Sequence, residues 1–266
     1  MIKREPTLSL PLRGRSESAG HRGSPRNLEL IRRVKANALV PPFGDPSPRE
    51  LFAHSSEDHP LRHTGNATGL ARMVRYDRTD EILIYISGQT IPKDRRNKRS
   101  GCAALFKTEQ PANTPKPLAF SLEKNGLNGQ IQPNTPITAA LRALVAALEL
   151  KTWGSEGWKQ VTIATDNKVL YAGITRHIVK WSSKGWLSET STHQPASPAL
   201  WIRALDLMNE QAYHGCEVKL WLITAQQNQH AAKMARTIAP SDSRSLVYKP
   251  CGDVGDTFKA ALGSDE

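Results

Sequence analysis

Asp166 lies at the carboxyl end of a predicted strand, the position at which α/β proteins often carry functional residues. The run from Val161 to Ala164 is apolar and β-branched, as in strands buried on both faces, and Asp166 ends it. Open α/β sheets hold their functional groups at the carboxyl ends of strands. The alternative is that Asp166 caps a helix beginning at Asn167 or Lys168, because Asp is a preferred N-cap residue.

Two basic segments could contact a sugar-phosphate backbone. The first is the loop 93–100 (KDRRNKRS), and the second is 180–186 (KWSSKGW), where lysines alternate with tryptophans. Lysines can pair with phosphates while aromatic rings pack beside them. The alternative for the second segment is that its tryptophans belong to the core and its lysines are solvated. The candidate contacts are Lys93, Arg95, Arg96, Lys98, Lys180, Trp181, Lys184 and Trp186.

The overall charge favours a polyanionic partner. The chain has 266 residues, a formal net charge of +11 and a pI near 9.7. This balance indicates nucleic acid first and an acidic membrane surface second. Because no stretch approaches the roughly 18 apolar residues of a membrane span, and no secretory signal core follows the N-terminus, we expect no membrane partner.

Cysteine usage favours a reducing compartment. Cys102, Cys216 and Cys251 form an odd count without a CxxC pair, and the first two border apolar runs, as buried small hydrophobes do. We therefore expect an intracellular protein, nuclear or cytoplasmic. The Arg-rich first 35 residues are similar to a mitochondrial transit peptide, although two glutamates argue against it. Mitochondrial residence stays as the alternative.

The chain divides into an arm, a domain and a tail. Residues 1–78 are rich in Pro, Gly, Ser and Arg and predict a mostly disordered basic arm. Residues 79–240 carry the periodic segments, and 241–266 predict a flexible C-terminal tail. The expected strands are 81–86, 101–106, 116–122, 161–166 and 217–224. One expected helix begins at Pro136 and has apolar residues as far as Leu148, and the others are 168–181, 198–214 and 228–237. This order of elements predicts an α/β fold.

The stretch from about Glu81 to Ala239 resembles ribonuclease H of the fungal type. The resemblance is carried by the words ILIYISG, TPITAALRALVAALEL, EGWKQVTIATDN, KWSSKGW, SPALWIRALDLM and VKLWLITAQQNQHAAKMA, in this order. It implies a five-stranded mixed sheet flanked by helices. In that sheet the first three strands are antiparallel, and the fourth and fifth run parallel to the first.

The resemblance also implies an activity, for which the required residues are missing. The family cleaves the RNA strand of an RNA·DNA hybrid with two divalent ions, Mg²⁺ or Mn²⁺, held by four acids. The family's four positions fall here at Ser87, Ala140, Asp166 and Ala232, so only the third acid is present. Serine and alanine cannot replace carboxylates as ligands of a hard cation. We therefore expect no metal site and no bound cofactor.

These observations predict a catalytically inactive ribonuclease H-like protein that binds RNA·DNA hybrid or structured RNA. The segments 93–99 and 180–186, together with Asn167, are the expected nucleic-acid contacts. One alternative is a weakly active, metal-dependent hybrid ribonuclease that uses Asp166. Another is a protein-docking module built on the same scaffold, and a third is a decayed gene copy. We expect a monomer, with protein partners left open.

Overall fold

The predicted order of strands forms the centre of one mixed sheet. The computed structural model describes residues 38–39, 41, 46–54, 72–93, 97–106, 118–183, 186, 195–241 and 244–252. The central strands are β3 (Glu81–Pro92), β4 (Lys98–Leu105), β5 (Leu118–Ser121), β6 (Gln160–Thr165) and β7 (Glu217–Leu222). Strands β3, β4 and β5 pair antiparallel, β6 pairs parallel with β3, and β7 parallel with β6. The predicted ribonuclease H-like fold class is therefore confirmed.

Two short strands extend this sheet to seven strands. The strands β1 (Phe52–His54) and β2 (Met73–Arg75) pair with each other, and β2 pairs antiparallel with β3. The short helix α2 (Pro48–Leu51) precedes β1. These three short elements lie within the arm 1–78, which the sequence predicts to be mostly disordered. A proline at the first helical position does not break a helix, and the side chains of Phe52 and Met73 are buried in the core.

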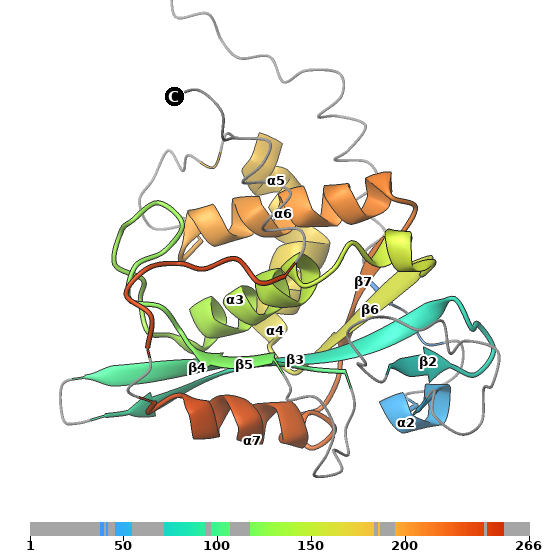
Figure 1. Ribbon diagram of the computed structural model, residues 1–266, viewed down its shortest axis with the longest axis horizontal. Coiled ribbons are helices and arrows are strands. Elements are labelled where there is room, and N and C mark those ends of the chain that lie inside the picture. The colour runs from blue at the N-terminus through green and yellow to red at the C-terminus, as the bar shows by residue number, and fades with distance from the viewer. Residues whose placement is uncertain are drawn as a thin grey trace, which may run out of the picture.

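Helices cover both faces of the sheet (Figure 1). The helices α3 (Pro136–Glu149) and α6 (Pro198–Tyr213) lie on one face, and α7 (Gln229–Ile238) lies on the other. All three helices are confirmed. The predicted helix 168–181 is interrupted, since α4 (Lys168–Ala172) and α5 (Ile178–Ser183) flank a π-helical turn, η3 (Gly173–His177). A 3-10 turn, η2 (Trp153–Glu156), follows α3.

The side chains of β3 alternate between two apolar layers. Ile82, Ile84 and Ile86 belong to the cluster that contains the buried face of α3, whereas Leu83 and Tyr85 pack with Ala231 of α7. This alternation is the period of two that a strand imposes. It follows that Ser87 lies on the α7 side of the sheet and that Gly88 faces α3.

A buried charge network joins the C-terminal segment to α3. The Arg142 guanidinium donates to Glu123 Oε1 at 2.8 Å and to the Lys249 carbonyl at 2.7 Å. Glu149 accepts from the Tyr248 hydroxyl at 2.6 Å and from the Arg203 Nε at 3.1 Å. Residues 248 and 249, within the predicted flexible tail 241–266, thus complete hydrogen bonds to the buried charges of Glu149 and Arg142.

Two expectations drawn from composition can be compared with the structure. Cys102 and Cys216 are fully buried, as predicted for small hydrophobes. Burial raises the pKa of the Cys216 thiol to about 12, so this cysteine is protonated at neutral pH. Within the described ranges, none of the helices has the length and apolar character that crossing a bilayer requires.

Replacing Arg142 by methionine should lower the free energy of unfolding by about 3–5 kcal/mol, because the buried Glu123 loses its cation. Urea denaturation followed by circular dichroism measures this change. The matched control is Lys219→Met, which breaks the partly exposed pair between Lys219 Nζ and Glu217 Oε2 and should cost no more than about 1 kcal/mol. Equal losses in the two variants would contradict the assignment of the Arg142 network as a stabilising core element.

Candidate functional site

Two of the four ribonuclease H positions meet on neighbouring strands. Strands β3 and β6 are paired in parallel up to Tyr85 and Ala164. Continuing this register by two residues places Ser87 beside Asp166, on the α7 side of the sheet. Ser87 is only 1% exposed. The carboxyl ends of the two parallel strands thus bring the first and third positions together, as the resemblance implies.

A glycine brings the second position into the same place. A Cβ atom on Gly88 would lie 2.0 Å from the backbone nitrogen of Ala140 and 2.4 Å from the carbonyl carbon of Ala139. The first turn of α3 therefore rests directly on the backbone of β3. This turn is fixed by Thr135, whose hydroxyl accepts from the Thr138 N–H at 3.2 Å. The Ala140 side chain is fully buried and offers no polar group.

The fourth position is joined to the others by the carboxamide of Asn228. Its Nδ2 donates to the Ile86 carbonyl at 2.9 Å and to Asp166 Oδ1 at 2.7 Å. The backbone carbonyl of Asn228 accepts from the backbone N–H of Ala232 at 3.0 Å, within the first turn of α7. One buried amide thus ties β3, β6 and α7 together at the site.

The sequence analysis did not identify Asn228 as a site residue. It places the start of the last helix at this residue, and asparagine is a preferred residue at helix starts. That signal predicts a cap, but Asn228 makes no side-chain capping bond in the structure. Its contacts are to residues 142 and 62 positions away in the chain, which only the tertiary fold brings close.

The alternative that Asp166 caps the following helix is wrong. Asn167 is the N-cap of α4, and its side chain accepts from the Leu170 N–H at 2.9 Å. Asp166 instead accepts the hydrogen bond from Asn228. The single retained acid therefore has a structural partner, and Asn167, an expected nucleic-acid contact, has its side-chain oxygen engaged in the helix cap.

The residues at this site do not fit the pair of divalent ions that ribonuclease H chemistry requires. Ser87, Ala140 and Ala232 supply no carboxylate, and one oxygen of Asp166 is hydrogen-bonded to Asn228. Across the described part of the chain, no three His, Cys, Asp or Glu side chains converge on a common point. A pair of hard cations needs several anionic oxygens in one small volume.

Polar and cationic groups cover Ser87 instead. The Gln89 Nε2 donates to the Ser87 hydroxyl at 3.1 Å, and the Arg236 Nη2 donates to Gln89 Oε1 at 3.4 Å. Arg236 is exposed on α7. The surface beside the former acid position thus carries a guanidinium, which attracts phosphate where carboxylates would repel it.

The two predicted basic segments occupy different places. Lys93 and Lys98 are exposed at the end of the β3–β4 hairpin, where the Lys93 N–H donates to the Asn97 carbonyl at 2.8 Å. Lys180 is exposed on α5, across the sheet from α7 (Figure 1). The remaining predicted cations, Arg95, Arg96 and Lys184, lie outside the described residues.

The two predicted tryptophans pack against the core. The Trp181 ring lies 5.1 Å from that of Trp201 in an edge-on arrangement and 6.5 Å from that of Trp186. Both Trp181 and Trp186 are half-buried beside the main apolar cluster. These contacts agree with the core interpretation of the segment and leave only part of each ring for a ligand.

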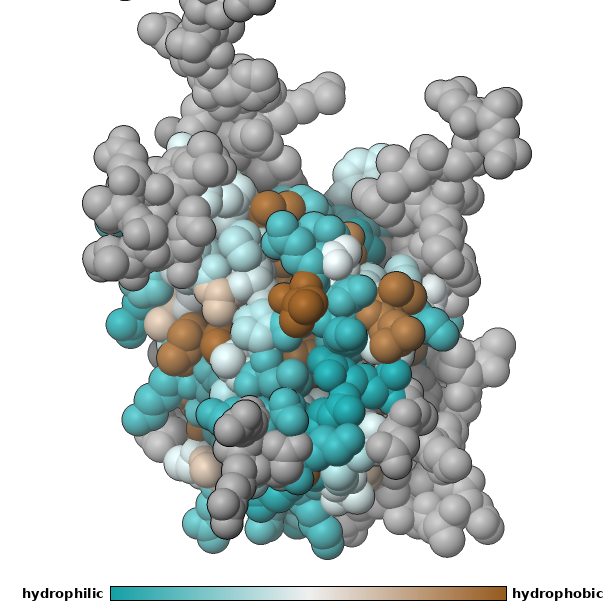
Figure 2. Space-filling model, turned by 90° about the vertical axis from the view of Figure 1, so that its left-hand side faces the viewer, coloured by the Kyte–Doolittle hydropathy of each residue, from teal (hydrophilic) through white to brown (hydrophobic). Residues whose placement is uncertain are grey.

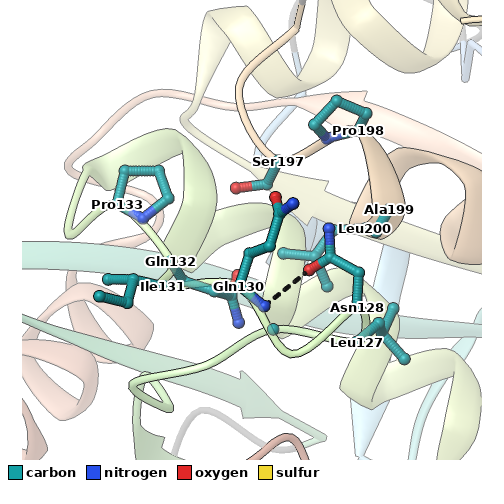
Figure 3. A pocket seen from close by; sticks show the side chains of 11 residues that line it. Leu127, Asn128, Gln130, Ile131, Gln132, Pro133, Ser197, Pro198, Ala199 and Leu200 are labelled. Atoms are coloured by element: carbon teal, nitrogen blue, oxygen red, sulfur yellow. Dashed lines mark hydrogen bonds between the residues drawn. The ribbon is translucent and has the colours of Figure 1, made fainter.

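A small cavity lies away from this site, between the loop 126–133 and the start of α6 (Figure 3). Its volume is about 150 Å³, and it includes Ser197 and Pro198 on one side. The loop is closed by the Gln130 N–H, which donates to Asn128 Oδ1 at 3.2 Å. Its lining contains no ionisable side chain and no residue that the sequence predicts for function.

Comparisons with known proteins agree with the observed fold. No protein-family model matches the sequence, and no curated protein matches it. The type 1 ribonuclease H LC9-RNase H1 is 20% identical, with a TM-score of 0.41 over 68% of this chain and 81% of that chain. The PFV ribonuclease H domain is 15% identical, with a TM-score of 0.39 over 62% and 95%.

A larger protein is similar over part of its length. The foamy viral protease-reverse transcriptase, solved in complex with an RNA/DNA hybrid, is 15% identical, with a TM-score of 0.43 over 59% of this chain. The match covers 20% of that chain. These likenesses concern the fold alone, and the fold of this chain is established by its own strand order.

Replacing Asn228 by alanine should lower the free energy of unfolding by about 1–3 kcal/mol, because the Ile86 carbonyl and Asp166 both lose their donor. In a double-mutant cycle with Asp166→Ala, thermal or urea unfolding should show coupling of about 0.5–3 kcal/mol. Thr237→Ala, an exposed change on the same helix, should stay within about 0.5 kcal/mol. If the losses of unfolding free energy in the Asp166→Ala and Asn228→Ala variants were additive, the hydrogen bond between Asn228 and Asp166 would contribute nothing to stability.

Proposed function

We propose that this protein binds nucleic acid, RNA·DNA hybrid or structured RNA, without cleaving it. The observation that supports the proposal is that Ala140 packs on β3 beside Ser87, that Asn228 at the start of α7 bonds Asp166, and that Asp166 is the single carboxylate among the four positions 87, 140, 166 and 232. The scaffold that arranges the four positions is intact, whereas the anionic oxygens needed for cleavage are missing. Loss of about three negative charges also removes local repulsion of phosphate.

The charge of the surface supports a nucleic-acid partner. The whole chain carries a formal net charge of +11. Within the described ranges, Lys93, Lys98 and Lys180 form no ion pair with a carboxylate and remain exposed. Exposed cations without an internal partner can release counterions when they contact phosphates, and this release drives nucleic-acid binding. We propose that Arg95, Arg96, Lys184, Trp181, Trp186 and Asn167 contribute further contacts to the nucleic acid.

The full-length chain should bind a labelled RNA·DNA hybrid at about 50 mM salt and leave it uncut in the presence of magnesium or manganese. Bound and cleaved fractions are read from one titration, by anisotropy and by denaturing gel. Asp166→Asn should change neither fraction by more than about twofold, because the carboxylate acts on Asn228 and not on a metal. Lys180→Gln should weaken binding by several-fold and reduce its salt dependence by about one phosphate contact.

The matched control for the binding measurement is Lys159→Gln. Lys159 pairs with Asp80 at the amino end of β6, away from the proposed surface. This substitution removes one positive charge, as Lys180→Gln does. Its affinity should equal that of the unmodified chain. Metal-dependent cleavage that disappears in Asp166→Asn would instead establish the enzyme alternative, and failure to bind hybrid, duplex RNA and single strands would reject the proposal.

A further inference from the structure

The exposed side of α7 is basic and carries no acid. The helix reads QHAAKMARTI, with Ala231 and Ala235 buried against the sheet and Lys233 and Arg236 exposed. The two cations are three positions apart, so their side chains lie on one face of the helix. None of the residues singled out from the sequence for nucleic-acid binding lies on this helix.

An arginine of β4 shares this side of the sheet. A Cβ on Gly101 would lie 2.0 Å from the Ala235 carbonyl oxygen, so the side-chain direction at Gly101 points to α7. Side chains alternate along a strand, and Arg99 therefore points to the same side. Gln89, which accepts from Arg236, is the register partner of Gly101. Arg99 and Arg236 thus approach the same corner of the sheet.

Arg244 adds a guanidinium that the backbone holds in place. Its Nε donates to the Leu122 carbonyl at 2.7 Å and its Nη2 to the Glu123 carbonyl at 3.1 Å, just beyond the edge strand β5. Burial and then the positive charge of Arg99 lower the pKa of Arg244. The nearby Glu123 carboxylate is bound to Arg142 on the other side of the sheet. The positive charges of Arg99 and Arg244 therefore interact, and the Glu123 carboxylate that partly offsets them is itself bound to Arg142.

We name Arg99, Lys233, Arg236 and Arg244 the α7 cationic face. Among the residues that the structure describes, none of the four forms an ion pair with a carboxylate. The end of the molecule viewed in Figure 2 is predominantly hydrophilic in its lower half, the half in which α7 lies. Like charges held together on a surface without acids lower the free energy of a bound polyanion.

We infer that the α7 cationic face binds the sugar-phosphate backbone of the nucleic acid, as a second contact surface across the sheet from Lys180 on α5. This inference rests on the proposed function and extends it. The arginines fit phosphate oxygens because a planar guanidinium presents paired donors, and Arg244 is already oriented by two carbonyls.

The test compares two doubly substituted full-length chains in the hybrid titration, repeated between about 50 and 200 mM salt. Arg99→Gln with Arg236→Gln should weaken binding about tenfold or more and reduce the slope of log affinity against log salt by roughly 1.8, about 0.9 per phosphate contact. Lys159→Gln with Lys219→Gln removes the same charge from pairs with Asp80 and Glu217 and should leave the slope unchanged.

The outcomes separate this inference from the proposed function. Binding that weakens in Lys180→Gln but keeps its slope in the Arg99 and Arg236 variant overturns the α7 cationic face alone. Absence of binding by the unmodified chain overturns both. Equal loss in the two doubly substituted chains shows a general charge effect and also overturns the inference. Circular dichroism and urea unfolding of each variant verify that the compared chains are folded.

Discussion

The contact between the Gly88 backbone and the first turn of α3 sets the geometry of the whole site. Because Gly88 has no Cβ, the peptide at Ala139 and Ala140 can rest on β3 at a distance that any other residue would block. This close approach fixes the height of α3 over the sheet. Farther along the same helix, Arg142 and Glu149 then reach the C-terminal segment and hold it with buried ionic hydrogen bonds. The packing of β3, α3 and the C-terminal segment thus depends on the absence of a side chain at Gly88.

The residue types at the four ribonuclease H positions decide which interactions the site can make. Of the four positions that the ribonuclease H resemblance assigns to acids, Ser87 accepts a hydrogen bond from Gln89, and Asp166 accepts one from Asn228. The bond between the Asp166 carboxylate and the buried amide connects β6 to the start of α7. Because the same amide also donates to the Ile86 carbonyl, it joins β3, β6 and the start of α7.

Three buried acids have partners inside the molecule. Glu81, Glu123 and Glu149 are buried and hydrogen-bonded to arginine, glutamine, threonine or tyrosine side chains. Two of their arginine partners, Arg75 and Arg142, are buried as well, so these charges compensate each other in the core. The exposed cations of α5 and α7 lie instead on helices whose sequences contain no acidic residue.

The sequence by itself determined the central strands, the helices and the loss of three acids, because apolar periodicity and residue identity are local properties. It did not determine that Phe52 and Met73 join the sheet, since isolated apolar residues among prolines carry no periodic signal. The roles of Asn228 and Arg244 were decided only by the tertiary structure, because their partners are distant in the chain. The same holds for Trp181, whose type suits both a ligand contact and the core, and which the packing of Trp201 places against the core.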